Sequence, residues 1–286
     1  MGGNVNQFGF RPGGRHAPSA DRPLYTLITI VRNAAETIEK TLRSVERQTY
    51  PAIEYIVVDA ASTDGTVDIL RRYEYLISHW CSEPDKGHAD GQNKGVAIAT
   101  GQFIGFVYAD DWLPDDFVEK SVAALVDGRF DFVFGDMDYY VGGEFVFTIR
   151  GDGDYRRRIT YRAPTMNYPT LTAHRRVFEG AGLFDPAYRV APDYEWLFRV
   201  HKAGFQGGYD PAVRYHFALG GNSTQHITRA TVEVARALCE LGANPVRVWA
   251  YAGLKIAFHT VDDLIRNHSS PAFYAWVRRL RKAVTP

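Results

Sequence analysis

The feature that most constrains the fold is residues 103–114, FIGFVYADDWLP, where an apolar run ends at two adjacent carboxylates. A continuous run of apolar, β-branched and aromatic residues predicts a strand buried on both faces, as in a parallel sheet. In open α/β sheets the ligand binds at the carboxyl ends of such strands. Asp110 and Asp111 repel each other, and hard carboxylate oxygens suit Mg²⁺ or Mn²⁺. The pair indicates either a metal site, or one helix-capping and one solvated carboxylate.

The stretches on either side of this strand repeat a pattern of strand, loop and helix. Apolar and β-branched runs predict strands, and apolar positions three or four residues apart predict helices. The predicted strands are residues 24–31, 53–59, 75–81, 103–107 and 130–134. The predicted helices between them are residues 36–48, 66–73, 90–99 and 115–126. This alternation predicts an α/β fold with a mostly parallel, doubly wound sheet flanked by helices.

After residue 134 the period of the pattern changes, and the chain ends in helices. Residues 139–149 alternate around Gly142-Gly143 and predict a hairpin, whereas residues 151–167 predict a loop. Helical spacing returns at residues 175–182, 192–203, 228–241, 246–258 and 273–284. Residues 1–22 are rich in Gly, Pro and Arg, which predicts a disordered tail. We therefore expect a tail at 1–22, an α/β domain at 23–225 and a C-terminal helical extension at 226–286.

Composition excludes several other classes of protein. Lys plus Arg and Asp plus Glu number 33 each, so we expect no nucleic-acid partner. Cys81 and Cys239 lie far apart and form no disulfide framework, which favours a reducing, cytoplasmic setting. No run of 18 apolar residues and no apolar signal core occurs, so we expect neither a membrane span nor a cleaved signal.

Four stretches, read together, carry a resemblance to a known family. They are ITIVRNAAETIEKTLRSVERQTYPAIEYIVVDAASTDGT (28–66), SEPDKGHADGQNKGVAIATGQFIGFVYADD (82–111), AHRRVFEGAGLFDPAYRVAPDYEWLFRV (173–200) and VRYHFALGGNST (213–224). Their order and spacing resemble the inverting GT-A-fold glycosyltransferases of family 2, which build bacterial polysaccharides and glycolipids. The resemblance covers about residues 24–225 and implies a GT-A, Rossmann-like sheet. It also implies transfer of a sugar from a nucleotide-sugar donor, with a UDP-sugar as the family-level expectation, to a hydroxyl of a glycan or lipid-linked acceptor.

The resemblance implies a divalent cation, Mn²⁺ or Mg²⁺, on the two phosphates of the donor. It assigns Asp111 to the metal and Asp110 to the metal or the ribose, where a cation would stabilise the leaving diphosphate as a Lewis acid. A strict Asp-x-Asp motif would need Asp at 109, where this chain has Ala109, and this leaves the ribose-side role open. His216 is either a third metal ligand or phosphate donor, or a structural histidine.

Two groups of residues match the family's donor-binding positions. Thr29, Asn33 and Asp59 follow or end the first two strands, where the base and ribose would lie. Ala60 stands where some relatives carry a uracil-reading Asp, so uridine preference rests on the family alone. The second group lies in the loop before the helix predicted at 90–99 and in the first turn of that helix. There Lys86 would meet a phosphate or the base, and Asp90 and Asn93 would hold hydroxyls of the sugar or ribose. Asp90 is also a candidate N-cap for its helix.

Asp193, in the stretch APDYEW, matches the family's general base, which deprotonates the acceptor hydroxyl for in-line attack at the anomeric carbon. The alternative is that Asp193 caps its helix while Glu195 supports the helix dipole. Glu195 is the second candidate for the base, and His174 is a further acceptor-side candidate.

Two other functions compete with the transferase. One is a non-catalytic nucleotide-binding or scaffold protein with the same fold, which retention of Asp110, Asp111 and Asp193 disfavours. The other is a nucleotidyltransferase, for which we expect a Gly-rich loop after the first strand, whereas VRNAAET has no glycine.

The C-terminal helices lie outside the resemblance. Phe273, Tyr274 and Trp276 precede the basic residues 278–282, a combination suited to an anionic bilayer surface. The sequence thus predicts either peripheral contact with the inner face of the cell membrane or packing on the sheet or on a second subunit of a homo-oligomer.

Overall fold

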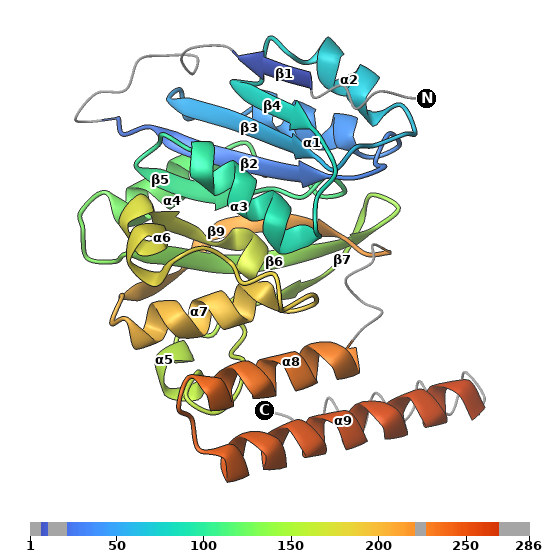
Figure 1. The fold of residues 1–286 in the computed structure, drawn as a ribbon, viewed down its shortest axis with the longest axis vertical. Helices are drawn as coiled ribbons and strands as arrows, with labels where there is room; N and C mark the ends of the chain where they lie inside the picture. Colours follow the sequence, from blue (N-terminus) through green and yellow to red (C-terminus); the bar gives the residue numbers. More distant parts are fainter. Residues whose placement is uncertain (1–6, 11–21, 221–226, 269–286) are drawn as a thin grey trace.

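One mixed β-sheet organises the protein (Figure 1). The structure is a computed structural model that describes residues 7–10, 22–220 and 227–268. The sheet within these residues has the strand order β1-β4-β3-β2-β5-β8-β6-β7, with β9 paired to β6. The strands are β1 (Gln7–Phe10), β2 (Tyr25–Val31), β3 (Ile53–Asp59), β4 (His79–Ser82), β5 (Phe103–Phe106), β6 (Phe132–Val141), β7 (Glu144–Ile149), β8 (Thr172–His174) and β9 (Gly207–Ala218).

Strand direction brings several strand ends to one edge of the sheet. β2 pairs in parallel with β3 and β5, and β3 pairs in parallel with β4. β8 is antiparallel to both β5 and β6, so β6 runs in the same direction as β2 and β5. The C-terminal ends of β2, β5 and β6 therefore lie at the same edge, where β6 turns back into β7.

Helices cover both faces of the sheet because the central strands supply two cores. In β2, Tyr25 and Leu27 lie in one core with α1, α2 and α4, whereas Ile28 lies in the other with α3, α6 and α7. Successive side chains of a strand point to opposite faces, so both faces of β2 need a cover. The helices are α1 (Ile38–Glu46), α2 (Thr66–Arg72), α3 (His88–Ile98), α4 (Phe117–Leu125), α5 (Tyr155–Arg158), α6 (Arg175–Ala181), α7 (Pro192–Lys202), α8 (Ile227–Glu240) and α9 (Pro245–His268).

The C-terminal helices extend the second core away from the sheet. Leu238 of α8 and Val248 of α9 are buried in the same core as Trp196 of α7. Figure 1 shows α8 below α7 and α9 at the lower end of the molecule. The described part of the extension thus packs on α7, whereas the sequence analysis named the sheet or a second subunit, and contact with a membrane or a second subunit stays a prediction. The helix predicted at 273–284 lies outside the described residues.

The predicted fold class is confirmed, and most predicted elements form within a few residues of their expected bounds. The strand at 53–59 is found as predicted. The hairpin is also confirmed, with Gly142 at φ +58° and Gly143 at φ +90° in its turn. Two consecutive positive φ values are what a type I′ turn requires, and glycine adopts them without strain. The domain boundaries proposed near residues 22 and 225 stay predictions.

Several elements differ from the predicted ones because tertiary pairing decides them. Residues 7–10, placed in the predicted disordered tail, form β1 along the outer side of β4. The strand predicted at 75–81 is only His79–Ser82, since Tyr75 is exposed in a turn.

The strand predicted at 130–134 continues to Val141 because β9 pairs along it. That partner has 12 residues. The helix predicted at 246–258 continues to His268, and the loop predicted at 151–167 contains the turn of α5.

Candidate active site

A cavity of about 1020 Å³ opens at the edge where β2, β5 and β6 end. Its walls come from the loop after β2, the loop after β5, the β6–β7 hairpin, the segment before β8 and the start of α7. Ligands of open α/β sheets bind at this edge. Of the residues predicted from the sequence, the cavity is lined by Asn33, Asp110, Asp111 and Asp193.

Asp111 is held rigidly beneath the cavity. Its Oδ2 accepts a hydrogen bond from the Tyr215 hydroxyl at 2.9 Å, and its Oδ1 accepts one from the Ala218 backbone N–H at 2.7 Å. Only 1% of its surface is exposed. Burial, followed by the charge of Asp110, raises the pKa of Asp111 to about 8, while Lys40 opposes the rise. The interactions of Asp111 in the fold therefore do not offset the cost of burying its charged form.

Asp110 offers its carboxylate to the cavity more freely. Burial raises the pKa of Asp110 as well. Among the described side chains of residues 22–220 and 228–260, none forms an ion pair with either Asp110 or Asp111. Two neighbouring carboxylates without a paired cation fit a hard divalent ion, which would relieve their repulsion.

His216 lies beside the loop that carries this pair, since its backbone bridges to Trp112. Its ring packs against Trp112 at 5.4 Å and Tyr140 at 5.0 Å between ring centroids, and its Nε2 lies 4.0 Å from Asp138. Within the described residues no three His, Cys, Asp or Glu side chains are grouped as metal ligands. The ring of His216 thus packs among aromatic side chains, and its role as a third metal ligand or phosphate donor stays a prediction.

Asp193 lies in the first turn of α7 and lines the same cavity. Desolvation raises the pKa of Asp193 to about 6, against hydrogen bonds from the backbone that lower it. It is not the N-cap, because α7 begins after Ala191 and has no side-chain cap. Burial, followed by the charges of Asp193, Asp111 and Asp110, raises the pKa of Tyr108, and these four side chains line one cavity. A carboxylate with a raised pKa is suited to accept a proton near neutral pH.

The other two acceptor-side candidates lie away from the cavity. Glu195 is buried and holds Arg199 through two hydrogen bonds, at 2.6 and 2.8 Å. His174 is in β8, where its ring packs on Phe103 at 4.6 Å between centroids. Both side chains therefore serve packing and ion pairing in the fold.

Of the first group of donor candidates, Asn33 lines the cavity, whereas Thr29 and Asp59 are buried. Thr29 is fully buried and shares a hydrogen bond with Tyr55. Asp59 is also buried and accepts hydrogen bonds from Ser62 and Ser82. Ser62 in turn accepts the backbone N–H of Asn33, at 2.7 Å. Asp59 therefore positions the loop that carries Asn33 and does not line the cavity itself.

Of the second group of donor candidates, Lys86 lines a smaller hollow of about 240 Å³. Asp90 accepts the backbone N–H of Lys86, and the N-cap of α3 is Gly87. The predicted capping role is thus replaced by a bond to the loop before the helix. Asn93 both donates to and accepts from the backbone of Phe184, at 2.8 and 2.9 Å, which ties α3 to the segment before α7.

Most of the other polar side chains that line the cavity were not predicted from the sequence. Arg32 and Arg189 are the cationic side chains among the cavity residues that the structure describes, and His88 and four tyrosines also line it. The tyrosines are Tyr108, Tyr139, Tyr168 and Tyr194. These residues come from separate elements and share no motif spacing. The only signal available was that each stands close to a strand end or helix start.

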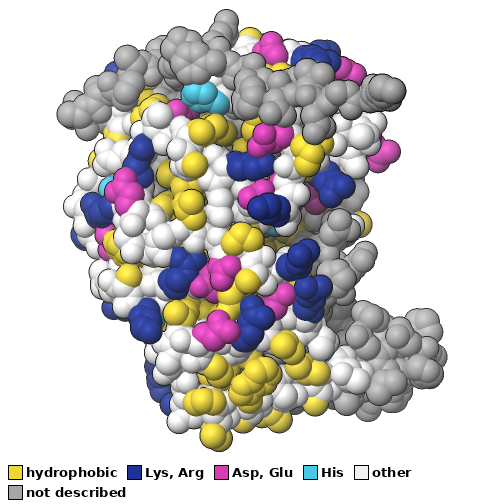
Figure 2. Space-filling view, in the orientation of Figure 1, with side chains coloured by type: hydrophobic (Ala, Val, Ile, Leu, Met, Phe, Trp, Pro, Cys, Tyr) yellow, Lys and Arg dark blue, Asp and Glu magenta, His cyan; other side chains and the backbone are white. Residues whose placement is uncertain are grey.

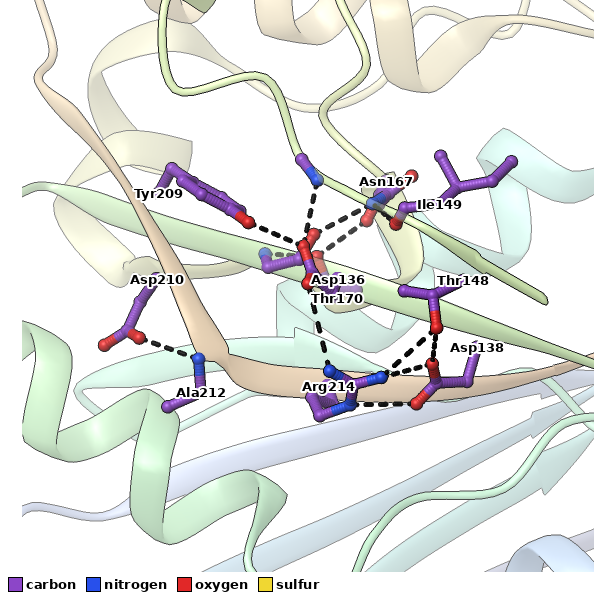
Figure 3. A network of polar contacts seen from close by, with 12 residues as sticks. Asp136, Asp138, Thr148, Ile149, Asn167, Thr170, Tyr209, Asp210, Ala212 and Arg214 are labelled. Carbon is purple, nitrogen blue, oxygen red and sulfur yellow. Dashed lines mark hydrogen bonds and ion pairs between the residues drawn. The ribbon is translucent and has the colours of Figure 1, made fainter. Parts of the chain in front are cut away.

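A polar network fixes one wall of the cavity (Figure 3). Arg214 of β9 binds Asp138 and lies 3.9 Å from Asp136, both on β6. Asp136 accepts the backbone N–H of Gly151 at 3.0 Å. Asn167, which lines the cavity at a φ of +42°, donates to the backbone oxygens of Gly135 and Ile149. The network thus joins β6, β7, β9 and the loop after β7 into one wall.

Comparison with known proteins identifies the family. Residues 26–189, more than half of the chain, match the model of glycosyl transferase family 2. The chain belongs to this family. This glycosyltransferase is 31% identical over 192 residues to a PGL/p-HBAD biosynthesis glycosyltransferase of Mycobacterium bovis, covering 62% of the chain and 69% of that relative. It is 37% identical over 116 residues to a Bacillus subtilis protein named for teichuronic acid biosynthesis, covering 40% of the chain and 46% of that relative.

Solved structures share the GT-A fold of this family 2 enzyme. The mannosyltransferase PcManGT from Pyrobaculum calidifontis, in complex with GDP-Man and Mn²⁺, superposes with a TM-score of 0.60. That match has 21% identity and covers 95% of this chain and 84% of the other. S. aureus TarS in complex with UDP gives a TM-score of 0.57 at 16% identity, covering 78% and 68% of the two chains.

Proposed function

We propose that this family 2 enzyme transfers a sugar from a nucleotide-sugar donor to an acceptor hydroxyl, with inversion, and that Asp193 is the general base. The observation that carries the proposal is the grouping of Asp110, Asp111 and Asp193 around one cavity, with raised pKa values. Single displacement needs a base on the acceptor side and a stabilised leaving group on the other side. The cavity offers both.

The donor's diphosphate would lie toward Asp110 and Asp111. A Mn²⁺ or Mg²⁺ ion held by Asp111, with Asp110 supporting the metal or the ribose, would supply Lewis-acid stabilisation of the leaving diphosphate. Arg32 and Arg189 line the same cavity and add positive charge for phosphate oxygens. Asn33, fixed through Ser62, contributes an amide at the mouth. The chain's own groups therefore orient the donor from both sides.

Asp193 would take the proton of the acceptor hydroxyl. Its raised pKa brings it close to neutrality, where a carboxylate is a more effective base than one at its ordinary pKa. Tyr108 and Tyr194 exclude water from its surroundings, and both phenols stay protonated because burial raises their pKa values. Inversion follows when the hydroxyl attacks opposite the leaving group.

The acceptor is proposed to be a glycan or a lipid-linked glycan in polysaccharide or glycolipid biosynthesis, as the names of the relatives indicate for those proteins. Within the described residues, no helix is long and apolar enough to cross a bilayer. A cytoplasmic location, a UDP-sugar donor and peripheral membrane contact remain proposals.

The test compares Asp193→Asn with Asp68→Asn, an exposed carboxylate in the first turn of α2. A thermal-shift panel of UDP-sugars and GDP-mannose with Mn²⁺ first finds the donor. Asp193→Asn should keep donor binding and lower turnover by about 10²- to 10⁴-fold, the usual contribution of a base. Asp68→Asn should leave both unchanged. Near-normal turnover of Asp193→Asn would remove the base assignment, and absence of any donor binding would favour a scaffold protein with this fold.

A further inference from the structure

Helix α8 of the C-terminal extension holds the backbone that leads into Asp193. Through one carboxylate oxygen, Oε2, Glu233 of α8 accepts the backbone N–H of Val190 at 2.8 Å and that of Ala191 at 3.1 Å. Ala191 is the N-cap of α7, and Asp193 follows it in the first turn. Figure 1 shows α8 directly below α7, and the two helices are in contact. A side chain of α8 therefore fixes the chain immediately before the general base.

The start of α7 depends on this contact because α7 has no cap of its own. Its N-cap, Ala191, has no polar side chain, and its first residue, Pro192, has no N–H. Val190 is half-buried and Ala191 is buried, so their N–H groups need an acceptor from another element. A carboxylate at this end also interacts favourably with the dipole of the helix. Glu233 thus does for α7 what a capping side chain does in other helices.

Glu233 itself is held in one place. Its exposed fraction is 7%, and its other oxygen, Oε1, lies 3.2 Å from Nε of Arg229. Burial opposes the charge of Glu233, but the hydrogen bonds from the backbone and from Arg229 outweigh burial and lower the pKa of Glu233. A buried polar group whose partners are all in place is rigid. The carboxylate is therefore a fixed, charged acceptor for the two N–H groups.

The segment that Glu233 holds is one wall of the cavity. The residues of this segment that line the cavity are Arg189, Val190, Pro192, Asp193 and Tyr194. Just before them, the Tyr188 hydroxyl donates a hydrogen bond to Glu240 of α8, and Cζ of Arg236 lies 4.4 Å from the centroid of the Tyr188 ring. On the face drawn in Figure 2, side chains of both charges lie over the region where α7 and α8 meet. Helix α8 thus holds this wall both through Tyr188 and through the backbone before Asp193.

Consecutive elements of the chain support the carboxylates on both sides of the cavity. Tyr215 and Ala218 of β9 donate to the two carboxylate oxygens of Asp111, and α8 is the next element along the chain. The match to the family model ends at residue 189, so it includes neither Asp193 nor α8. The support of Asp193 is therefore a feature of this chain's own C-terminal part.

We propose that Glu233 is a positioning residue for Asp193, and that α8 is thereby part of the catalytic unit of the enzyme. The inference rests on the proposed function, in which Asp193 is the general base. Glu233 lines neither the cavity nor the smaller hollow, so it acts through the backbone of Val190 and Ala191. A base must lie within hydrogen-bond reach of the proton that it removes, and a displacement of about 1 Å can lower the rate about 100-fold.

The test measures kcat as release of the nucleoside diphosphate from the donor that the thermal-shift panel identifies. Glu233→Ala leaves the two N–H groups without their acceptor, and its kcat should fall about 100-fold. Glu233→Gln keeps an oxygen at the same reach, and its kcat should stay within about tenfold of the wild type. The matched control is Glu240→Ala, which removes another carboxylate of α8, one that binds the Tyr188 side chain and not the backbone before Asp193. Its kcat should change by about twofold or less.

A double-mutant cycle separates positioning of the base from a general loss of stability. In the Asp193→Asn background, Glu233→Ala should lower kcat by about threefold or less, because no base is left to displace. Near-normal kcat in Glu233→Ala, or the same loss of kcat in both backgrounds, would overturn the inference. So would an equal loss in Glu240→Ala. If Glu233→Ala does not fold, Glu233→Asp takes its place, since it keeps the charge but is one methylene too short to reach the backbone.

Donor binding and the Asp193→Asn variant separate this inference from the proposed function. The affinity for the nucleotide sugar with Mn²⁺ should stay within about twofold in all Glu233 variants, because Asp110, Asp111 and Asn33 are held by other elements. If Asp193→Asn loses turnover while Glu233→Ala keeps it, only the role of Glu233 fails. If Asp193→Asn turns over normally, or if no nucleotide sugar binds, the proposed function fails, whatever the Glu233 variants show.

Discussion

Replacing Asp111 with Asn should stabilise the metal-free protein increasingly as the pH rises. The pKa of Asp111 rises from 3.8 to about 8 in the folded state. Between these values the folded state binds a proton that the unfolded state has released, so the stability of the wild type falls with increasing pH. The loss is about 1.4 kcal/mol per pH unit, or about 2 kcal/mol between about pH 6 and pH 7.5. An amide at position 111 does not titrate and avoids this loss.

The pH dependence is a better readout than the absolute stability. An amide oxygen can still accept the Ala218 N–H, but the amide cannot accept from Tyr215 as the carboxylate does. That change costs about 1 kcal/mol at every pH. Histidines and Asp193 titrate equally in both proteins, so they cancel in the difference between variant and wild type. The difference should therefore grow by about 2 kcal/mol over that pH range, even if the variant is less stable at the acidic end.

The measurement is equilibrium urea unfolding in a chelator, for both proteins at several pH values. Parallel stability curves for the two proteins would refute the reasoning, because they would show that Asp111 is ionised in the fold without cost. Adding Mn²⁺ extends the test: the cation competes with the proton, so wild-type stabilisation should be larger near pH 7.5 than near pH 6. Equal stabilisation of Asp111→Asn by Mn²⁺ would place the cation elsewhere.

Two further predictions follow from the same structure. At saturating donor and constant Mn²⁺, the kcat of the wild type should fall about tenfold per pH unit below about pH 6, because Asp193 must be deprotonated to act as a base. A kcat that stays constant down to pH 5 would contradict this. A chain truncated after His268 lacks the basic residues 278–282, which lie outside the described residues. If these residues bind the membrane, the truncated chain should lose co-sedimentation with vesicles rich in phosphatidylglycerol at low salt. Equal sedimentation of both forms would exclude membrane binding by these residues.

Local signals in the sequence were enough to predict the sheet and its carboxylates. The buried strands at 53–59 and 103–107 are rich in apolar and β-branched residues, and Asp110 and Asp111 follow the second of them after Tyr108 and Ala109. Asp193 was chosen because the stretch APDYEW matches the position of the general base in the family that the chain resembles. Strand ends in a parallel sheet meet at one edge, so these local features also predict a shared site.

Contacts between distant segments could not be predicted from such signals. Asn93 has the expected place on α3, yet its amide is used by the backbone of Phe184, 91 residues away. Glu195 stands one helical turn from Arg199, and the pair could have been recognised as an i,i+4 ion pair. The aromatic lining of the cavity, by contrast, comes from separate loops and strands. No spacing rule connects these residues before the chain is folded.

Two neighbouring residues of the motif VRYHF contact the loop that carries the carboxylates. His216 was chosen for its chemistry, but its neighbour Tyr215 makes the contact to the carboxylate: its hydroxyl donates to Asp111 and accepts the backbone N–H of Tyr108. His216 contributes through its backbone, which exchanges hydrogen bonds with Trp112 at 3.2 Å. On the opposite side, Thr41 of α1 donates to the backbone oxygen of Asp111 at 2.6 Å. The loop with both carboxylates is therefore fixed from two sides before any ligand binds, and such preorganisation is what electrostatic stabilisation of a leaving group requires.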